Sequence, residues 1–253
     1  MANELVFSVG CVAEVLGLCA IVIILVVGNK AGGFGSYPSF NYHPLFMTLG
    51  FVFLFGQGIL SFQVIKFFNI QIPRTVEKLI HFGTMSMGCM LMVIGWACAD
   101  SRDNSDLFTH LIEYNGSPHC SIGLAAIIVF GLQGLVGFSF FLFPKCGSPL
   151  LRSKVVKVHR LIGLFSFLMA VIAAMMGATE MALLQSLNDS MSSVRSLLAL
   201  YVSCVLLFAL SVLTIHLRPL LTTAEEQKNY SNIELAADDE MSEMVITENT
   251  ENC

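Results

Sequence analysis

Four histidines stand at or near the beginnings of long apolar segments, where an ionisable side chain is costly unless it has a partner or a function. They are His43, His81, His119 and His159. Neutral imidazole ligates transition metals and haem iron, and imidazole also carries protons near neutral pH. Four such groups in apolar segments therefore indicate metal, haem or proton chemistry within a membrane.

A glycine accompanies each of these histidines on one face of its predicted helix, because residues four or seven positions apart lie above one another. The pairs are His43 with Gly50, His81 with Gly88, His119 with Gly123 and His159 with Gly163. A glycine removes side-chain bulk beside the imidazole and leaves room for a flat ligand. A porphyrin held by two axial histidines from facing helices needs such room, and helix bundles build ligand sites in this way.

The helices that carry these residues are predicted to span a membrane. Of the 253 residues, 55% are hydrophobic and 12% are charged, with a mean hydropathy of +0.76, whereas soluble domains are about 25% charged. A helix needs about 20 apolar residues to cross the hydrocarbon layer, and six segments reach that length. They cover about residues 6–28, 44–67, 79–99, 120–143, 160–184 and 196–217. We therefore predict an all-α fold, a six-helix transmembrane bundle with up-down topology over residues 1–220. An acidic tail, 221–253, is predicted to be cytoplasmic and disordered.

The basic residues orient this bundle in the membrane. Ten of the thirteen fall on one side of the predicted topology, namely Lys66, Arg74, Lys78, Lys145, Arg152, Lys154, Lys157, Arg160, Arg218 and Lys228. Only Lys30, Arg102 and Arg195 fall on the other side. Because basic residues accumulate in cytoplasmic loops, both termini are predicted to be cytoplasmic. His43 and His119 then lie towards the outer face, and His81 and His159 lie towards the cytoplasmic face.

Two histidines at each level predict two haem b groups per chain, stacked between spans 2–5. Iron that has a histidine on both axial sides has no open position for oxygen or substrate, which suits it to electron transfer. One haem near each face would form a relay across the membrane. Basic residues beside the cytoplasmic pair, including Arg74 and Lys78, can attract a small anionic reductant, although the topology alone would also place them there. On the outer side, candidate acceptor-site groups are His110, Tyr114 and Asn115.

Spans 2–5 resemble the eukaryotic cytochrome b561 family of ascorbate-dependent transmembrane electron carriers. The matching stretches are NYHPLFMTLGFVFLFGQGIL (41–60), EKLIHFG (77–83), SPHCSIGL (117–124), VGFSFFLFP (136–144) and LRSKVVKVHRLIG (151–163). The resemblance implies the axial pairs His43 with His119 and His81 with His159. It also implies a homodimer, cytoplasmic ascorbate as the donor, and monodehydroascorbate or ferric iron as the acceptor on the lumenal or extracellular side. Lys78, Arg152 and Lys66 match family basic positions at the cytoplasmic side, and with Arg74 they are the predicted ascorbate-binding residues.

The chain departs from the family pattern at several positions. Phe62-Gln63 stands where the family usually has a tyrosine-arginine pair at the cytoplasmic end of span 2. Ser121 replaces a tryptophan two residues after the span 4 histidine, and Met85 replaces a second histidine one turn after His81. These departures leave haem binding intact and bear on the choice of donor and acceptor.

An alternative interpretation is a haem-free membrane transporter that uses the histidines as a metal or proton path. The composition offers no basic face for nucleic acid, and no GxGxxG motif indicates a flavin or nicotinamide site. The tail sequence YSNI, 230–233, has the form of a sorting signal, so vesicular, endosomal, lysosomal and plasma membranes all stay open. Glu14 lies inside the first span, where a carboxylate is costly unless it is paired or neutral, and we expect it to be paired or to reach the cytoplasmic interface.

Overall fold

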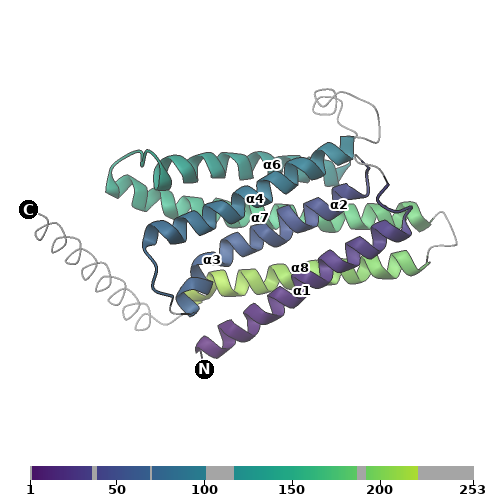
Figure 1. Ribbon diagram of the computed structural model, residues 1–253, viewed down its shortest axis with the longest axis horizontal. Coiled ribbons are helices and arrows are strands. Elements are labelled where there is room, and N and C mark those ends of the chain that lie inside the picture. Colours follow the sequence, from purple (N-terminus) through teal and green to yellow (C-terminus); the bar gives the residue numbers. More distant parts are fainter. Residues whose placement is uncertain (1, 36–38, 69, 101–116, 187–191, 222–253) are drawn as a thin grey trace, which may run out of the picture. The chain divides into compact units, whose positions relative to one another are not determined.

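Long helices make up the computed structural model, which describes residues 2–35, 39–68, 70–100, 117–186 and 192–221. In chain order they are α1 (Ala2–Lys30), α2 (Tyr42–Phe46), the π-helix η1 (Met47–Leu54), α3 (Phe55–Phe67), α4 (Arg74–Asp100), α6 (Pro118–Gly137), the π-helix η2 (Phe138–Leu142), α7 (Pro149–Ser186) and α8 (Ser192–Leu221) (Figure 1). Within these ranges there is no strand. The all-α prediction is therefore confirmed for the described part of the chain.

Six of the helical segments are long and apolar enough to cross a membrane, as predicted. They run over Phe7–Lys30, Tyr42–Lys66, Arg74–Ala99, Pro118–Leu142, Pro149–Leu183 and Ser193–Arg218. The fifth segment begins at Pro149, well before the predicted residue 160, because its helix continues through a stretch rich in basic residues that hydropathy alone assigns to a loop. Large apolar side chains such as Val22 and Leu132 point outward, as expected for helices whose outer faces meet lipid.

The chain divides into two compact units, Met1–Ile215 and His216–Cys253. The six-span prediction concerns the first unit. The predicted tail, 221–253, falls almost entirely outside the described residues, so its disorder stays a prediction.

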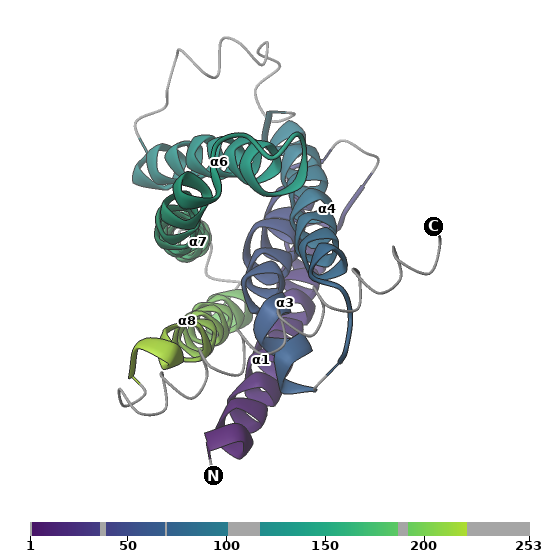
Figure 2. The ribbon, with the colours of Figure 1, turned by 90° about the vertical axis from the view of Figure 1, so that its left-hand side faces the viewer.

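Two antiparallel helix pairs form the part of the first unit that carries the histidines. One pair is α2, η1 and α3 against α4, and the other is α6 with η2 against α7. Figure 2 looks nearly along the helices and shows α6 beside α7, and α3 beside α4. A hydrogen bond of 2.8 Å between the buried hydroxyls of Thr48 and Tyr201 attaches α8 to η1. Each pair therefore contributes two of the four histidines.

Close backbone contact holds η1 against α4. A Cβ atom on Gly50 would lie 2.7 Å from the carbonyl oxygen of Gly88, and one on Gly88 would lie 2.8 Å from that of Gly50. Small residues let membrane helices approach in this way. The expectation that these two glycines leave room for a flat ligand is therefore wrong, because the backbone of each glycine fills the space beside the other.

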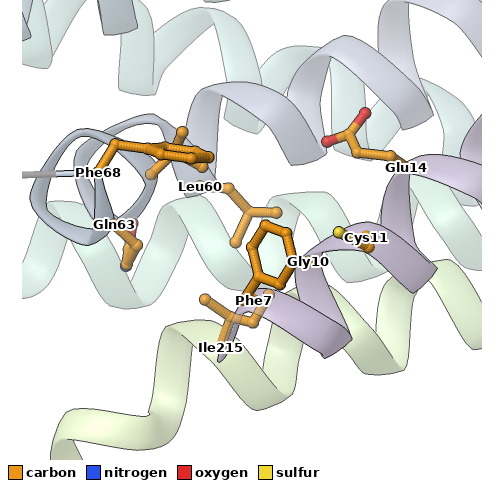
Figure 3. Close-up of a pocket in the computed structure, with 9 residues that line it drawn as sticks. Phe7, Gly10, Cys11, Glu14, Leu60, Gln63, Phe68 and Ile215 are labelled. Atoms are coloured by element: carbon orange, nitrogen blue, oxygen red, sulfur yellow. The ribbon is translucent and has the colours of Figure 1, made fainter. Parts of the chain in front are cut away.

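Glu14 of α1 is paired, as expected, and its partner among the described residues is an amide. The side-chain nitrogen of Gln57 donates a 2.7 Å hydrogen bond to its carboxylate. Glu14 stands at one end of a pocket of about 160 Å³ between α1, α3 and α8, which is otherwise lined mainly by apolar side chains such as Phe7 and Leu60 (Figure 3). The Gln57 amide thus satisfies a carboxylate oxygen inside an apolar span.

Replacing Gln57 with leucine should lower the free energy of unfolding by about 1–3 kcal/mol, because the carboxylate of Glu14 loses its donor in an apolar setting. Thermal unfolding of the purified protein in detergent measures the change. The double variant Glu14→Leu/Gln57→Leu is the control and should recover most of the loss, since removal of both partners leaves no unsatisfied group. Equal instability of the single and double variants would contradict the pairing.

Candidate functional site

The imidazole rings of His43 and His119 face each other across the two helix pairs. His43 lies on α2 and His119 on α6, and their ring centroids are 6.1 Å apart with planes at 84°. A metal–imidazole bond is about 2.0 Å long, so two rings that ligate one metal from opposite sides have centroids roughly 6 Å apart. We call these residues the first histidine pair. Their separation fits one metal ion between them.

In the first pair, the Nδ1 atom of each ring is hydrogen-bonded to a backbone carbonyl. The Nδ1 of His43 lies 2.9 Å from the carbonyl oxygen of Gly95 on α4, and the Nδ1 of His119 lies 2.7 Å from that of Ala173 on α7. Only a protonated Nδ1 can donate to a carbonyl, so each ring keeps Nε2 as its lone-pair nitrogen. Metal-ligating histidines are held in this way, with one nitrogen on the metal and the other on a carbonyl or carboxylate.

His81 and His159 form the second histidine pair, from α4 and α7. They lie close enough to interact electrostatically. The Nδ1 of His81 lies 2.7 Å from the carbonyl oxygen of Gly58 on α3. The Nδ1 of His159 is buried and has no hydrogen-bond partner within the described ranges. The second pair therefore differs from the first, because only one of its two rings is held by a carbonyl.

Glycines on the neighbouring helix lie against the rings of the α6–α7 pair. A Cβ atom on Gly177 of α7 would lie 2.8 Å from the ring of His119, and a Cβ atom on Gly137 of α6 would lie 3.1 Å from the ring of His159. Each of these helices thus provides a histidine and the glycine that accommodates the other's histidine. The sequence reasoning missed Gly137 and Gly177, because it considered only glycines on the histidine's own helix.

The glycines predicted for the α6–α7 pair border open space. A Cβ atom on Gly163 would meet nothing within 4 Å, and one on Gly123 would meet only the Cβ of Ala173 at 3.8 Å. Further open glycines on α6 are Gly131 and Gly134. At Gly123 and Gly163, therefore, no close neighbour would obstruct a flat ligand beside the helix.

Aromatic rings border the histidines, as suits an apolar macrocycle. Phe40 stacks on His43 with ring centroids 5.7 Å apart, and Phe62 lies 5.3 Å from His81. The ring of Phe141 lies 5.6 Å from that of His159. The donor set and its surroundings therefore fit haem bound through two axial histidines at each level.

A metal site made by the protein alone has less support. Across the described ranges, no three His, Cys, Asp or Glu side chains gather where they could hold an ion. Zinc and similar ions take three or four protein ligands, whereas haem supplies four nitrogens and needs only two axial ligands. The histidine arrangement therefore disfavours the haem-free metal path.

Basic side chains gather near the second histidine pair. Lys78 lies within electrostatic range of three other basic side chains, those of Arg74, Arg152 and Lys145. The guanidinium of Arg74 sits 5.7 Å from the ring centroid of Phe62, in a cation–π arrangement. We call Arg74, Lys78, Lys145 and Arg152 the basic cluster. It contains three of the four predicted ascorbate-binding residues.

Two members of the basic cluster, Arg74 and Arg152, are held by polar contacts of their own. Arg74 forms a 2.6 Å ion pair with Glu77, whose carboxylate is largely buried. Arg152 donates hydrogen bonds to the carbonyls of Lys145 and Gly147, at 3.0 and 3.1 Å, and so attaches the loop before α7 to that helix. Lys145 was predicted to lie on the cytoplasmic side but was not predicted to bind ascorbate, because only the folded loop brings it close to Lys78.

The remaining predicted residues lie elsewhere. Lys66 is exposed in the last turn of α3 and is not among the charges that act on Lys78. The predicted acceptor-site residues His110, Tyr114 and Asn115 lie outside the described residues.

Comparison with known proteins gives one consistent relationship. The model of the family described as eukaryotic cytochrome b561 matches residues 42–185. A transmembrane ascorbate ferrireductase from Arabidopsis thaliana is 30% identical over 67% of this chain and 69% of its own length. A probable ascorbate-specific transmembrane electron transporter from Oryza sativa is 29% identical over 88% of this chain and 94% of its own length. A transmembrane ascorbate-dependent reductase from Pongo abelii is 30% identical over 72% and 69%.

Replacing Gly177 with alanine should displace the ring of His119, because the added methyl group would come within 2.8 Å of it. Overpacking of this kind costs about 1–3 kcal/mol, so the unfolding temperature should fall and the visible absorption of any cofactor held by this ring should change. Gly10→Ala is the matched control, since a Cβ atom there meets nothing within 4 Å. If both variants behave like the original protein, the ring does not rest on Gly177.

Proposed function

Because the chain belongs to the eukaryotic cytochrome b561 family, we propose that it carries electrons across a membrane, from ascorbate on the cytoplasmic side to an acceptor on the lumenal or extracellular side. It is an integral multi-pass membrane protein with six candidate spans. Names of its relatives include an ascorbate ferrireductase and ascorbate-dependent reductases. We assign the same class of reaction to this chain, an ascorbate-dependent transmembrane oxidoreductase.

The family implies haem, and we assign two haem b groups to each chain. His43 and His119 would hold one haem, and His81 and His159 would hold the other. The observation that carries this assignment is the first histidine pair, whose rings lie 6.1 Å apart with both Nδ1 atoms on backbone carbonyls. When bound, each haem supplies an iron that alternates between the ferric and ferrous states with both axial positions filled.

The residues of this chain orient the ligands. The carbonyls of Gly95, Gly58 and Ala173 fix three rings in the tautomer that leaves Nε2 for iron. Gly137 and Gly177 let two rings lie against the neighbouring helix. Both histidine pairs lie on helices that belong to the apolar spans, where the surrounding medium is of low polarity.

We assign the second histidine pair to the cytoplasmic face, because the basic residues of the chain accumulate on that side. The basic cluster then faces the cytoplasm, where its charges would attract and hold the ascorbate anion. Arg74 has a particular part in this. It places a guanidinium over Phe62, beside the position where the family usually has arginine and this chain has Gln63. Arg74 can thus supply a cation that Gln63 cannot.

The proposed acceptor on the outer side, beyond the first histidine pair, is monodehydroascorbate or ferric iron. Each of these acceptors takes up a single electron, which matches a carrier that has no open iron position. His110, Tyr114 and Asn115 stay the candidate residues of the acceptor site. A homodimer and an endosomal, lysosomal, vesicular or plasma membrane location are further parts of the proposal that rest on the sequence.

The purified protein should contain about two haems per chain and should show low-spin bis-histidine spectra that change on addition of ascorbate. Alanine at His119 or at His81 should lower the haem content to about one per chain, because each variant removes an axial ligand of one site. Haem extraction and visible spectra measure both effects. His216→Ala is the control, since His216 belongs to neither pair. A protein without haem, or full haem in both ligand variants, would refute the assignment.

Replacing Lys78 or Arg152 with glutamine should slow reduction by ascorbate roughly tenfold at low ionic strength, because each variant removes a charge that attracts the anion. Haem content should not change. Stopped-flow absorbance after mixing with ascorbate gives the rate, and added salt should narrow the gap between variant and original protein. Lys154→Gln, which removes an equal charge from the exposed start of α7, is the control. Equal rates in all these proteins would place ascorbate elsewhere.

A further inference from the structure

A group of buried phenylalanine rings lies between the two histidine pairs. Its members are Phe51 of η1, Phe55 of α3, Phe130 of α6 and Phe167 of α7, with side chains 5%, 3%, 8% and 0% exposed. We call these four residues the phenylalanine bridge. Phe51 and Phe55 belong to one helix pair, and Phe130 and Phe167 belong to the other. The cluster therefore joins the two pairs.

Phe51, Phe130 and Phe167 lie at mid-depth along their helices, whereas Phe55 lies three residues before Gly58 and so nearer the second histidine pair. Phe51 follows His43 by eight residues and precedes Gly58, which bonds His81, by seven. Phe130 follows His119 by eleven residues and precedes Gly137, which accommodates His159, by seven. At a rise of about 1.5 Å per residue, Phe130 is about 16 Å from one level and about 10 Å from the other. The bridge thus occupies the interval that separates the two predicted haems.

The four rings contact one another within this interval and connect the two helix pairs. Phe55 is central, because its ring centroid lies 4.8 Å from that of Phe130 and 5.5 Å from that of Phe167. Phe51 lies 5.5 Å from Phe130 in an edge-to-face arrangement. These separations are typical of aromatic pairs in direct contact. An apolar, densely packed connection therefore runs from α3 to both helices of the other pair.

We infer that the phenylalanine bridge is the medium through which the electron passes between the two haem sites. The inference rests on the proposed function. In this step the iron held by His81 and His159 goes from ferrous to ferric, and the iron held by His43 and His119 goes from ferric to ferrous. No bond forms or breaks, so the rate depends on the matter between the two sites. Protein interiors packed without voids carry electrons by tunnelling faster than gaps do.

Alanine at Phe55 or at Phe130 tests the bridge, because either change leaves a cavity between the two histidine levels. The rate of electron transfer between the two sites is measured by flash or pulse reduction of one haem, followed by the spectral change of the other. We expect a several-fold slower transfer in both variants, with haem content, midpoint potentials and the low-spin spectra of each site unchanged.

Phe208→Ala is the matched control. Phe208 is 1% exposed and contacts Phe53 and Phe167, but it lies on α8, which carries none of the four histidines. It should destabilise the protein as much as the bridge variants in thermal unfolding while leaving the transfer rate unchanged. Phe55→Leu and Phe130→Leu form a second set of variants. Because leucine fills most of the cavity that alanine leaves, these variants should slow the transfer less than the alanine variants do.

The outcomes separate the inference from the function on which it rests. Unchanged transfer in Phe55→Ala and Phe130→Ala, with two haems that ascorbate reduces, would overturn the bridge and keep the proposed function. The same slowing in Phe208→Ala would also overturn it, because the effect would then follow from lost stability. An original protein that lacks haem would remove the proposed function and the bridge together.

Discussion

The main constraint on this structure is that each imidazole inside an apolar span needs a hydrogen-bond partner for its Nδ1 atom. A buried ring nitrogen without a partner is costly, and no water is available to satisfy it. Three of the four histidines solve this with a backbone carbonyl of the adjacent helix, provided by Gly95, Gly58 and Ala173. All three acceptors are small residues, because only a small side chain lets a ring reach the backbone behind it. The same bond leaves the lone pair of Nε2 available to a ligand.

This constraint explains why the bundle consists of two similar antiparallel pairs. Within each pair, every histidine meets a small residue of the other helix, so the two helices must run in opposite directions and in fixed register. Each pair then presents one ring at each level, and the proposed haem at each level would receive one ligand from each pair. His159 is the exception, since its Nδ1 has no partner in the described part of the chain. The two levels are therefore chemically unequal.

Near the second histidine pair, contacts between helices and not the residue type at one position set the local charge. Phe62 lies against His81 and carries the guanidinium of Arg74 on its ring. A cation from the start of α4 therefore lies beside the cytoplasmic end of α3, where this chain has Phe62 and Gln63. Glu77 moderates that charge through its ion pair with Arg74. Charge near the site is set by this network and not by the residue type at position 63 alone.

The sequence by itself determined the six apolar spans, the four histidines and their two levels, because hydropathy and alternating topology are properties of the chain read in order. It also indicated Lys78, Arg74 and Arg152, since these stand close to the histidines along the chain. Only the tertiary structure decided that Gly50 and Gly88 fill each other's space, that Gly137 and Gly177 accommodate the rings, and that Lys145 joins the basic cluster. These contacts depend on the register of one helix against another. Spacing within a single helix carries no information about that register.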